Sequence, residues 1–411
     1  DILLGVLGFV HREHELLADT VGRRIYTLHI KDLKTGEMVG QPIETTGGYG
    51  VWADDQTLFY PRQDVNTLRT YQVLRHSVGS NPMSDALVFQ EDDEEFYVGV
   101  GRSKSREFVM IQSSQTLSDE VRYLDASNPR GQFTVVAPRK RGLEYSVDHA
   151  GDWFYIRSNA DGADNFKLSR ARPGATSVDQ WEDVVAHDED VYLEGFEVSS
   201  GHLAVQERTN ALRRLRIRDL VDGSEHFVAF DEPAYSVALS TNRAYDTDML
   251  RYTYTSMTTP TQTVDYDMDS RAKKIVKQEE VVGDFDSDDY VTERSWATAS
   301  DGVRIPISIV RHIETPVDGS APALLYGYGS YGASMNASFS STRLSLLDRG
   351  FVFAIAHIRG GQEMGRRWYE DGKLMRKMNT FTDFIAAGEH LIAEGYAAPD
   401  GLYANGGSAA C

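Results

Sequence analysis

The sequence has little cysteine, no long apolar run and few basic residues relative to acidic ones. Its single cysteine, Cys411, excludes an internal disulfide and a cysteine-rich metal site, and it fits a reducing compartment. The longest apolar runs have the length of a β-strand, so we expect no membrane-spanning segment. The opening residues DILLGVLGFV lack the basic flank and cleavage site of a signal peptide and begin as a strand would. We therefore expect a cytoplasmic protein whose natural N-terminus lies upstream of this chain.

Acidic residues outnumber basic ones by 62 to 42, which gives a formal net charge of −20. A surface of this kind repels nucleic acids and anionic membranes and attracts cationic ligands. Neither a nucleic acid nor a membrane is therefore an expected partner. The same charge is also typical of an acidic protein whose surface is simply well solvated.

Short β-rich segments recur through the first two thirds of the chain, at intervals of roughly forty to fifty residues. The recurring segments are ELLADT, TLFYPR, EFVMIQ, WFYIRS, HLAVQE and RYTYTS. Each has one strand-like run before it and two after it. Four short antiparallel strands per repeat are the signature of a β-propeller blade, whereas a β-sandwich would not keep one period over this length. We predict six blades between residues 5 and 282 and a propeller domain over residues 1–285. A propeller alone does not define a chemistry.

After the acidic stretch VVGDFDSDDY, residues 281–290, the pattern of the sequence changes. Strand-like runs at TERSWATAS, VRIPISIVRH, PALLYGYG and FVFAIAHI now alternate with helical patterns at STRLSLLDRG and TFTDFIAAGEHLIAEG. In the second helix, Thr380 and Asp383 predict a capping box at the start, and Gly395 predicts the C-cap. Strands joined by helices indicate a largely parallel sheet with helices on its faces. We expect residues 286–411 to be the N-terminal part of a second, α/β domain.

The chain ends on LYANGGSAAC, a predicted strand followed by a sharp turn that carries Ser408. The pattern Gly406-Gly407-Ser408-Ala409-Ala410 approximates G-x-S-x-G, the nucleophile elbow, in which a strained turn lifts a serine hydroxyl above a sheet. The small flanking residues suit a turn where backbone crowds backbone. A serine in a glycine turn is otherwise an ordinary loop residue, so the motif alone leaves both readings open.

A second stretch, YGYGSYG at residues 326–332, follows the third strand of the second domain. In hydrolases of this architecture, the loop after the third strand supplies one donor of the oxyanion hole. The stretch also contains Gly327-x-Gly329-x-x-Gly332, which has the form of a dinucleotide fingerprint. The residues after it, ASMNASFSSTR, do not begin an amphipathic helix, so no helix N-terminus is placed to hold a pyrophosphate. We therefore expect no cofactor and no metal.

Together these stretches resemble the prolyl oligopeptidase family of serine peptidases, and in particular its oligopeptidase B group. The resemblance rests on YGYGSYG, on RGGQEMGRRWYEDGK and on GGSA, with EYSVDH, YLEGF and YTSMTTP in the propeller. It implies a seven-bladed propeller that caps an α/β-hydrolase domain. It also implies cleavage of short peptides, after Arg or Lys in oligopeptidase B and after Pro in its relatives.

The resemblance implies roles for four residues of this chain. Ser408 matches the nucleophile, and Tyr328 matches the phenol that donates a hydrogen bond to the oxyanion. The backbone N–H of Ala409 matches the second oxyanion donor. Tyr331 matches an aromatic residue beside the primary specificity pocket. Ordinary packing is the alternative reading for both tyrosines.

The chain departs from the family pattern at several positions. Ala410 and Cys411 replace the last two glycines of Gly-Gly-Ser-Ala-Gly-Gly, and Gln362 stands where a third glycine is usual. Asn336 and Ser338 occupy substrate-binding positions where oligopeptidase B often has aspartates that attract a second basic residue. We therefore expect only a weak preference for dibasic sites.

His357 and His390 cannot supply the catalytic base, because they precede Ser408 and the order in such hydrolases is serine, acid, histidine. By the resemblance, the acid, the histidine and the carboxylates that bind the Arg or Lys side chain lie beyond residue 411. The first blade likewise lies before residue 1. The predicted function is a serine endopeptidase that cuts short basic peptides. The alternatives are an inactive propeller and hydrolase protein that only binds, a prolyl-specific oligopeptidase, and an esterase on the same fold. The oligomeric state stays open.

Overall fold

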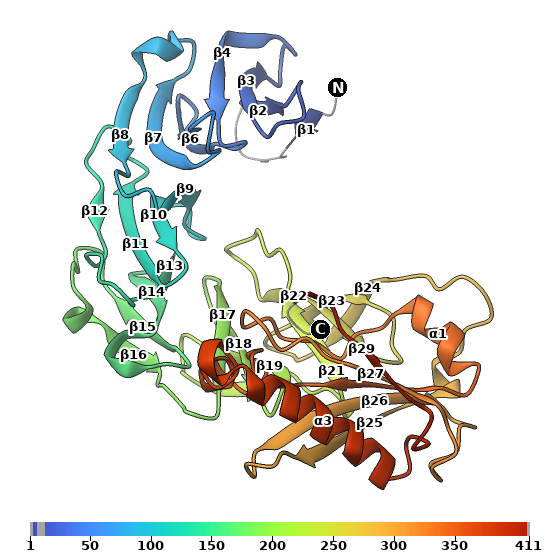
Figure 1. Ribbon diagram of the computed structural model, residues 1–411. Helices are drawn as coiled ribbons and strands as arrows, with labels where there is room; N and C mark the ends of the chain where they lie inside the picture. Colours follow the sequence, from blue (N-terminus) through green and yellow to red (C-terminus); the bar gives the residue numbers. More distant parts are fainter. Residues whose placement is uncertain (1–2, 6–12, 409–411) are drawn as a thin grey trace. The chain divides into compact units, whose positions relative to one another are not determined.

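The computed structural model describes residues 3–5 and 13–408, drawn as a ribbon in Figure 1. The chain divides into two compact units. One comprises Asp1–Gly162 and Lys167–Ala186, and the other comprises Ala163–Phe166 and His187–Cys411. The predicted domain boundary at residue 285 falls inside the second unit, and it stays a prediction. Among the described residues, none of the helices has the length and apolar character needed to cross a membrane.

The first unit contains four groups of four antiparallel strands in its described part. The first two groups are β1 (Leu3–Gly5), β2 (Glu13–Ala18), β3 (Tyr26–Asp32) and β4 (Met38–Thr46), then β5 (Val51–Asp54), β6 (Thr57–Gln63), β7 (Thr70–Ser77) and β8 (Ala86–Gln90). One register pair, Thr46 with Arg62, joins these two groups into an eight-stranded sheet. The next two are β9 (Tyr97–Arg102), β10 (Phe108–Gln115), β11 (Ser118–Asp125) and β12 (Thr134–Val135), then β13 (Tyr145–Ala150), β14 (Trp153–Ser158), β15 (Lys167–Ala171) and β16 (Glu182–Val185).

The second unit begins with two more groups of the same kind. They are β17 (Tyr192–Val198), β18 (His202–Thr209), β19 (Leu212–Asp219) and β20 (Glu225–Phe227), then β21 (Tyr235–Leu239), β22 (Met249–Ser256), β23 (Gln262–Asp267) and β24 (Lys273–Gln278). The six predicted repeats are thus confirmed within the described residues, and they are blades of a β-propeller. A seventh blade stays a prediction.

Apolar and charged side chains alternate along β19, LRRLRIRD, and this alternation shows why these segments pack as blades. Leu215 and Ile217 are buried in a cluster with Val237 of the next blade. The side chains between them point to the other face of the strand, where Arg216 pairs with Glu207 at 2.7 Å. An apolar face against the neighbouring blade and a charged face elsewhere is the period-2 pattern of a half-buried strand.

Up to Ser408, where the description ends, the rest of the second unit is a five-stranded sheet with three α-helices. Its strands are β25 (Tyr290–Thr298), β26 (Arg304–His312), β27 (Ala323–Tyr326), β28 (Val352–Ala356) and β29 (Leu402–Asn405), in the order β25-β26-β28-β27-β29. Its helices are α1 (Ser341–Leu347), α2 (Arg366–Glu370) and α3 (Met378–Ala393). Short 3₁₀ turns occupy Pro82–Ser84, Ala160–Gly162, Val178–Gln180, Ser287–Asp289 and Leu374–Arg376 along the chain. The partial α/β-hydrolase domain is therefore confirmed.

The prediction of a largely parallel sheet holds for only part of these strands. β27 is parallel to both β28 and β29, whereas β26 is antiparallel to both β25 and β28. A short turn links β25 to β26, and such a link cannot make the crossover that parallel strands require.

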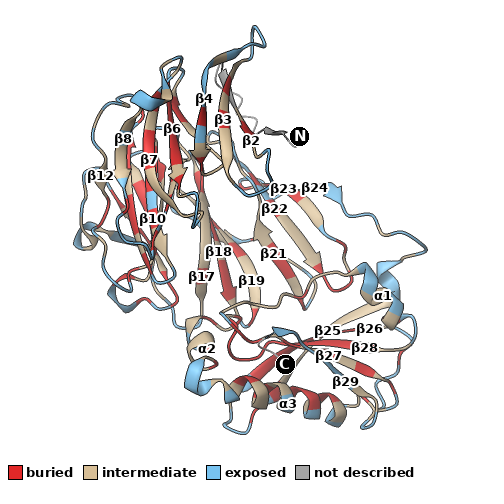
Figure 2. Ribbon diagram, turned by 45° about the horizontal axis from the view of Figure 1, so that its top comes forward, coloured by how far each residue is buried: buried red, intermediate tan, exposed pale blue. Residues whose placement is uncertain are grey.

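Both faces of the central strands are covered, as the burial colours of Figure 2 show for β26 and β28. Along β28 the side chains alternate between two cores. Ala354 lies in the core that includes Leu391 of α3, and Phe353 and Ile355 lie in the core that includes Leu347 of α1. This two-sided burial explains why the strand reads as a continuous apolar run.

The predicted capping box of the long helix is wrong. α3 begins at Met378 with Lys377 as its N-cap residue, so Thr380 and Asp383 lie inside the helix and are buried. Both of these side chains bind Arg359 instead of the helix end. The C-terminal prediction is correct, because Gly395 follows the helix with φ +78° and donates its N–H to the Ile392 carbonyl.

Candidate active site

Two loops of the hydrolase domain start side by side at the carboxyl ends of parallel strands. Tyr326, the last residue of β27, is in register with Asn405, the last residue of β29. The N–H of Gly327 then donates to the Asn405 carbonyl at 3.3 Å. The loop after β27 carries Tyr328 and the turn after β29 carries Ser408. This edge of an α/β sheet is where ligands bind.

Ser408 follows β29 in a left-handed conformation, with φ +54° and an exposed side chain. A residue other than glycine pays a steric penalty in this region, so its occurrence marks a strained turn. That is the backbone geometry expected of a nucleophile elbow. Ala409 lies outside the described residues, so its predicted role as an oxyanion donor remains a prediction. A Cβ on Gly407 would meet nothing within 4 Å, so the described residues show no crowding there.

The glycines near this edge let three backbones approach closely. Gly329 has φ +65°, and a Cβ on it would lie 2.6 Å from the Thr380 side chain. A Cβ on Gly360 would lie 1.9 Å from the Gly329 carbonyl oxygen, and one on Gly372 would lie 2.1 Å from the Gly360 nitrogen. Packing between these loops therefore accounts for the glycines that imitate a dinucleotide fingerprint.

A buried arginine next to these loops is held in place by two carboxylates. The Arg359 side chain forms two hydrogen bonds with Asp383, from Nη2 at 2.6 Å and from Nε at 2.9 Å, and its Nη1 donates to Asp301 at 2.6 Å. The Arg359 guanidinium is 4% exposed and the Asp383 carboxylate is not exposed at all. These two carboxylates, Asp383 above all, raise the pKa of Arg359 further above its usual value. Thr380 also donates to the Arg359 carbonyl at 2.7 Å.

A lysine at the start of α3 reaches the same loop. The Nζ of Lys377 donates to the Gly329 carbonyl at 2.6 Å and to the Ser330 hydroxyl at 2.5 Å. Further along the loop, the N–H of Gly332 donates to the Gly360 carbonyl at 2.9 Å. The loop that carries Tyr328 is thus anchored immediately after that residue.

The later part of this loop is fixed by a buried glutamate. The Oε1 of Glu363 accepts a hydrogen bond from the N–H of Met335 at 2.7 Å. Its Oε2 is buried and has no hydrogen-bond partner among the described residues. Burial raises the pKa of Glu363 to about 7. An ionised carboxylate is costly in such a place, so this group is partly protonated near neutral pH.

The two tyrosines of the loop differ in environment. Tyr328 is half-buried, and its hydroxyl makes no hydrogen bond to another described residue, which leaves it free to donate. Tyr331 is 79% exposed and has φ +57°. The structure therefore presents both side chains as available to a ligand, and it does not place either within a packed core.

Comparison with known proteins identifies the family of this chain. The family model described as "Prolyl oligopeptidase, N-terminal beta-propeller domain" matches residues 7–279, and the model of the prolyl oligopeptidase family matches residues 337–409. The chain belongs to the prolyl oligopeptidase family. The resemblance read from the sequence is confirmed.

Several relatives of this family align with nearly the whole chain. Dipeptidyl aminopeptidase BI of Pseudoxanthomonas mexicana is 50% identical over 97% of this chain and 56% of its own length. Protease 2 of Moraxella lacunata is 36% identical over 97% of this chain and 57% of its own length. The solved structure of oligopeptidase B from Leishmania major has a TM-score of 0.85 at 35% identity, covering 97% of this chain and 57% of that one. Oligopeptidase B from Trypanosoma brucei with covalently bound antipain has a TM-score of 0.84 at 34% identity, with the same coverage. The chain spans a little more than half of the length of these relatives.

Of the two predicted substrate-binding residues, Asn336 is bound to the protein through its side chain, whereas Ser338 is bound through its backbone carbonyl. Nη2 of Arg208, from β18, donates to the Asn336 amide oxygen at 2.9 Å. Nε of Arg208 also bonds Glu194 at 2.6 Å. The Ser338 carbonyl accepts from Nη1 of Arg343 at 2.9 Å. Asn336 is therefore turned toward a propeller strand, while the side chain of Ser338 is only half-buried.

His357 and His390, which precede Ser408 in the sequence, are each hydrogen-bonded to a serine hydroxyl of the sheet. Nε2 of His357 is hydrogen-bonded to the Ser308 hydroxyl at 2.8 Å, and burial lowers the pKa of His357 to about 3. Nε2 of His390 is hydrogen-bonded to the Ser295 hydroxyl at 2.6 Å. A buried imidazole whose pKa is lowered this far suits packing better than proton transfer near neutral pH.

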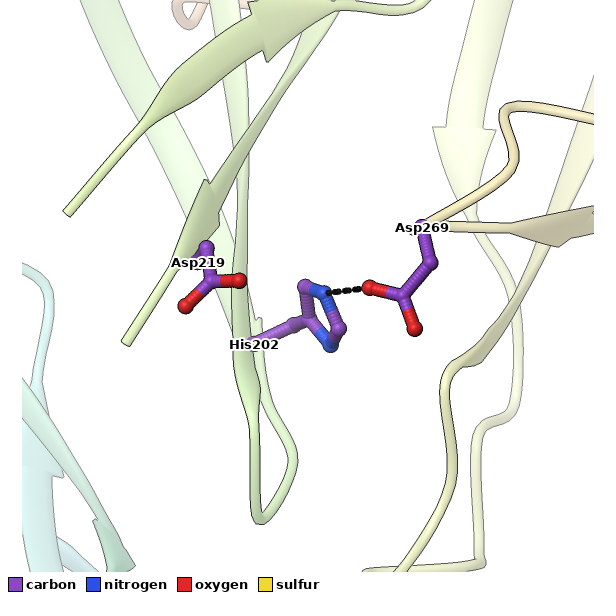
Figure 3. Close-up of side chains that lie close together, drawn as sticks. All are labelled: His202, Asp219 and Asp269. Carbon is purple, nitrogen blue, oxygen red and sulfur yellow. Dashed lines mark ion pairs between the residues drawn. The ribbon is translucent and has the colours of Figure 1, made fainter. Parts of the chain in front are cut away.

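One group of side chains in the described residues brings metal-ligand atoms together, as Figure 3 shows. His202 and Asp219 are register partners at the ends of β18 and β19, and Asp269 follows β23 of the next blade. His202 is buried, and its Nε2 forms an ion pair with Asp269 at 3.0 Å. Its Nδ1 lies 3.7 Å from a further carboxylate, Asp248. Contacts between carboxylates and both ring nitrogens of His202 are enough to explain why these side chains lie together. The group lies on the blades and not on the loops of the sheet.

Sequence reasoning missed four residues that position these loops: Arg208, Arg359, Glu363 and Lys377. Two of them, Arg359 and Glu363, stand within the stretch RGGQE, among residues that are otherwise small or neutral. A charged residue in a glycine-rich loop beside a buried strand was the available signal. No local pattern pointed to Arg208, because its partner lies 128 residues away in the sequence.

Proposed function

We propose that the full-length protein is a serine peptidase that hydrolyses short peptides, with Ser408 as its nucleophile. The observation that carries this proposal is the strained backbone of Ser408, φ +54°, at the end of a strand whose parallel neighbour leads into the Tyr328 loop. Membership of the prolyl oligopeptidase family supports the same role.

In the proposed mechanism, a histidine from the part of the protein beyond residue 411 takes the proton of the Ser408 hydroxyl. The serine oxygen then attacks the peptide carbonyl. The Tyr328 hydroxyl and the N–H of Ala409 stabilise the negative oxygen that forms, because donors placed where charge develops lower the barrier. The histidine protonates the leaving amine, and water later releases the acyl group from Ser408.

The finer part of the proposal is cleavage after Arg or Lys. The likeness to two solved oligopeptidase B structures supports it, and the net charge of −20 favours cationic substrates. The side chain of Tyr331 is exposed, which supports the proposal that it contacts the substrate. The engagement of Asn336 by Arg208 agrees with a weak preference for a second basic residue.

A second candidate is removal of dipeptides from a free N-terminus. The observation that favours it is the 50% identity to a protein named dipeptidyl aminopeptidase BI. This candidate uses the same nucleophile and the same oxyanion loop, and it differs in how the N-terminal side of the substrate is bound.

One experiment separates these possibilities. The full-length protein and its Ser408→Ala variant are incubated with a ten-residue peptide that has an internal Arg and an internal Pro, in free and N-acetylated forms. Mass spectrometry then identifies the products. Cleavage after Arg in both forms supports the endopeptidase, whereas release of a dipeptide from the free form alone supports the second candidate. Cleavage after Pro would identify a prolyl-specific enzyme. No cleavage, with no labelling of Ser408 by a fluorophosphonate, would contradict peptidase activity and favour a binding protein.

A further inference from the structure

The carbonyl oxygen of Gly329 is the point where three segments of the active-site loops meet. It accepts a hydrogen bond from Lys377 at 2.6 Å, and the Thr380 hydroxyl lies 3.4 Å away. The backbone of Gly360 packs so closely that a Cβ there would lie 1.9 Å from this oxygen. Tyr328 lies between this anchored carbonyl and Gly327, whose N–H donates to the Asn405 carbonyl at 3.3 Å, so the backbone on both sides of the Tyr328 side chain is held.

The contacts of Lys377 differ from those of an ordinary surface lysine. Its ammonium group donates to two acceptors of this one loop, the Gly329 carbonyl and the Ser330 hydroxyl. No carboxylate pairs with it in the described part of the chain. Lys373, four residues earlier, shows the usual arrangement, with its Nζ 2.7 Å from a carboxylate oxygen of Glu370. Hydrogen bonds from a charged donor are stronger than neutral ones, so the Lys377 contacts hold the turn firmly.

We infer that Lys377 is a positioning residue that holds the Gly329–Ser330 turn so that the Tyr328 hydroxyl points at the developing oxyanion. The inference rests on the proposed function, because the oxyanion role of Tyr328 belongs to that proposal. A purely structural role for Lys377 would affect stability and substrate binding but would not act selectively on the transition state.

The first test compares variants of the full-length enzyme by their kcat and KM. Loss of one oxyanion donor costs about 100-fold or more, so misplacing that donor in Lys377→Met should lower kcat by roughly 10- to 100-fold. KM should change by no more than about two-fold, because substrate binding is left intact. Lys377→Arg keeps the charged donors and should recover most of the activity. Lys373→Met, the matched control, should behave as the wild type.

The second test uses two inhibitors with one peptide sequence, an aldehyde and the corresponding alcohol. The aldehyde adds to the Ser408 hydroxyl and places an oxygen in the oxyanion hole, whereas the alcohol binds without forming that bond. Lys377→Met should weaken the aldehyde by about the same factor as it lowers kcat, since both report on the tetrahedral state. The affinity for the alcohol should not change.

The outcomes separate this inference from the proposed function. If the wild type hydrolyses no peptide and binds no aldehyde, both are overturned. If the wild type is active and Lys377→Met keeps its kcat, or weakens both inhibitors equally, only the role of Lys377 is overturned. Thermal unfolding of each variant shows whether it is folded. Should Lys377→Met not fold, Ser330→Ala removes one of the two acceptors, and a fall in kcat without a change in alcohol affinity would support the inference. An unchanged kcat in Ser330→Ala would then overturn it.

Discussion

The Arg208 guanidinium donates a hydrogen bond to the amide oxygen of Asn336 at 2.9 Å, and so a propeller strand holds the loop that follows Tyr328. The Arg208 side chain is only 1% exposed, and Glu194 balances its charge from the neighbouring strand of the same blade. Because Arg208 already binds its side chain, Asn336 is part of the contact between the blade and the loop. This relationship changes what a substitution at residue 336 should do.

We predict that Asn336→Asp does not create a preference for dibasic substrates. An aspartate at this position would accept a charge-assisted hydrogen bond from Arg208 and would not be free to bind a substrate cation. The ratio of kcat/KM for an Arg-Arg peptide to that for an Ala-Arg peptide should change by less than about two-fold. Ser338→Asp is the matched comparison, because the side chain at residue 338 is only half-buried. A tenfold or larger rise of this ratio in Asn336→Asp would show that residue 336 faces the substrate.

The pair of Arg359 and Asp383 should be a strong contributor to stability. Removing one partner of a buried ion pair leaves the other charge without compensation, which typically costs about 3–5 kcal/mol. We therefore expect Asp383→Asn to lower the free energy of unfolding by an amount in that range, as measured by urea unfolding of the full-length protein. Arg367→Ala provides the control, since Arg367 is 91% exposed and lies 3.7 Å from Asp371. An exposed pair contributes about 0–1 kcal/mol. A cost for Asp383→Asn no larger than the control's would contradict the prediction.

The sequence was sufficient for those parts of the fold that depend on local pattern. The period of the blades is visible in the recurring segments, and the alternation of apolar and charged residues is visible within single strands such as β19. The structure confirms both. The same holds for Gly395, which ends α3 with a left-handed backbone. Thr380 and Asp383 illustrate the limit. Their spacing fits a capping box, but burial and the Arg359 side chain give them another role.

The candidate site divides in the same way. Ser408 and Tyr328 stand in short motifs whose chemistry can be read directly. Lys377 contacts a carbonyl 48 residues earlier in the chain, and Arg208 contacts a side chain 128 residues later. Contacts of this range depend on how strands and loops come together, which no local spacing records.

Stability should depend on pH through Glu363. Burial raises the pKa of Glu363 to about 7 from an ordinary value of 4.5. Between these values the folded protein keeps a proton that the unfolded chain has released, so the free energy of unfolding falls as the pH rises through this window. Glu363→Gln mimics the protonated form and removes this loss. We expect the variant to match the wild type near pH 4.5 and to be more stable at pH 8, by an amount on the order of 3 kcal/mol.

Glu370→Gln is the control for this measurement. Despite partial burial, which acts to raise it, the pKa of Glu370 is lowered, mainly through the hydrogen bond with Lys373. The ionised form of Glu370 therefore stabilises the fold, a contribution present above the unfolded pKa and lost as the pH falls. The control should be slightly less stable than the wild type at pH 8, which is the opposite sign. Thermal unfolding from pH 4.5 to pH 8 measures this pH dependence. If it is the same for the wild type and Glu363→Gln, the pKa of Glu363 is not raised in the folded protein.

The last prediction concerns Tyr328 in the full-length enzyme. Tyr328→Phe keeps the ring and removes only the hydroxyl, and that hydroxyl has no hydrogen-bond partner within the described residues. Its loss should therefore leave the melting temperature almost unchanged, because no buried acceptor is left unsatisfied. Turnover should fall by about 100-fold or more, as it does when one oxyanion donor is removed elsewhere, while KM stays within a few-fold. Rate assays with an ester of Arg give kcat and KM, and thermal unfolding of the same samples gives the melting temperature. A rise in KM with kcat intact would mean that Tyr328 packs against the substrate and does not stabilise the oxyanion. Tyr97→Phe is the internal control, since Tyr97 lies on β9 of the propeller and is 57% exposed, so loss of its hydroxyl should leave kcat unchanged.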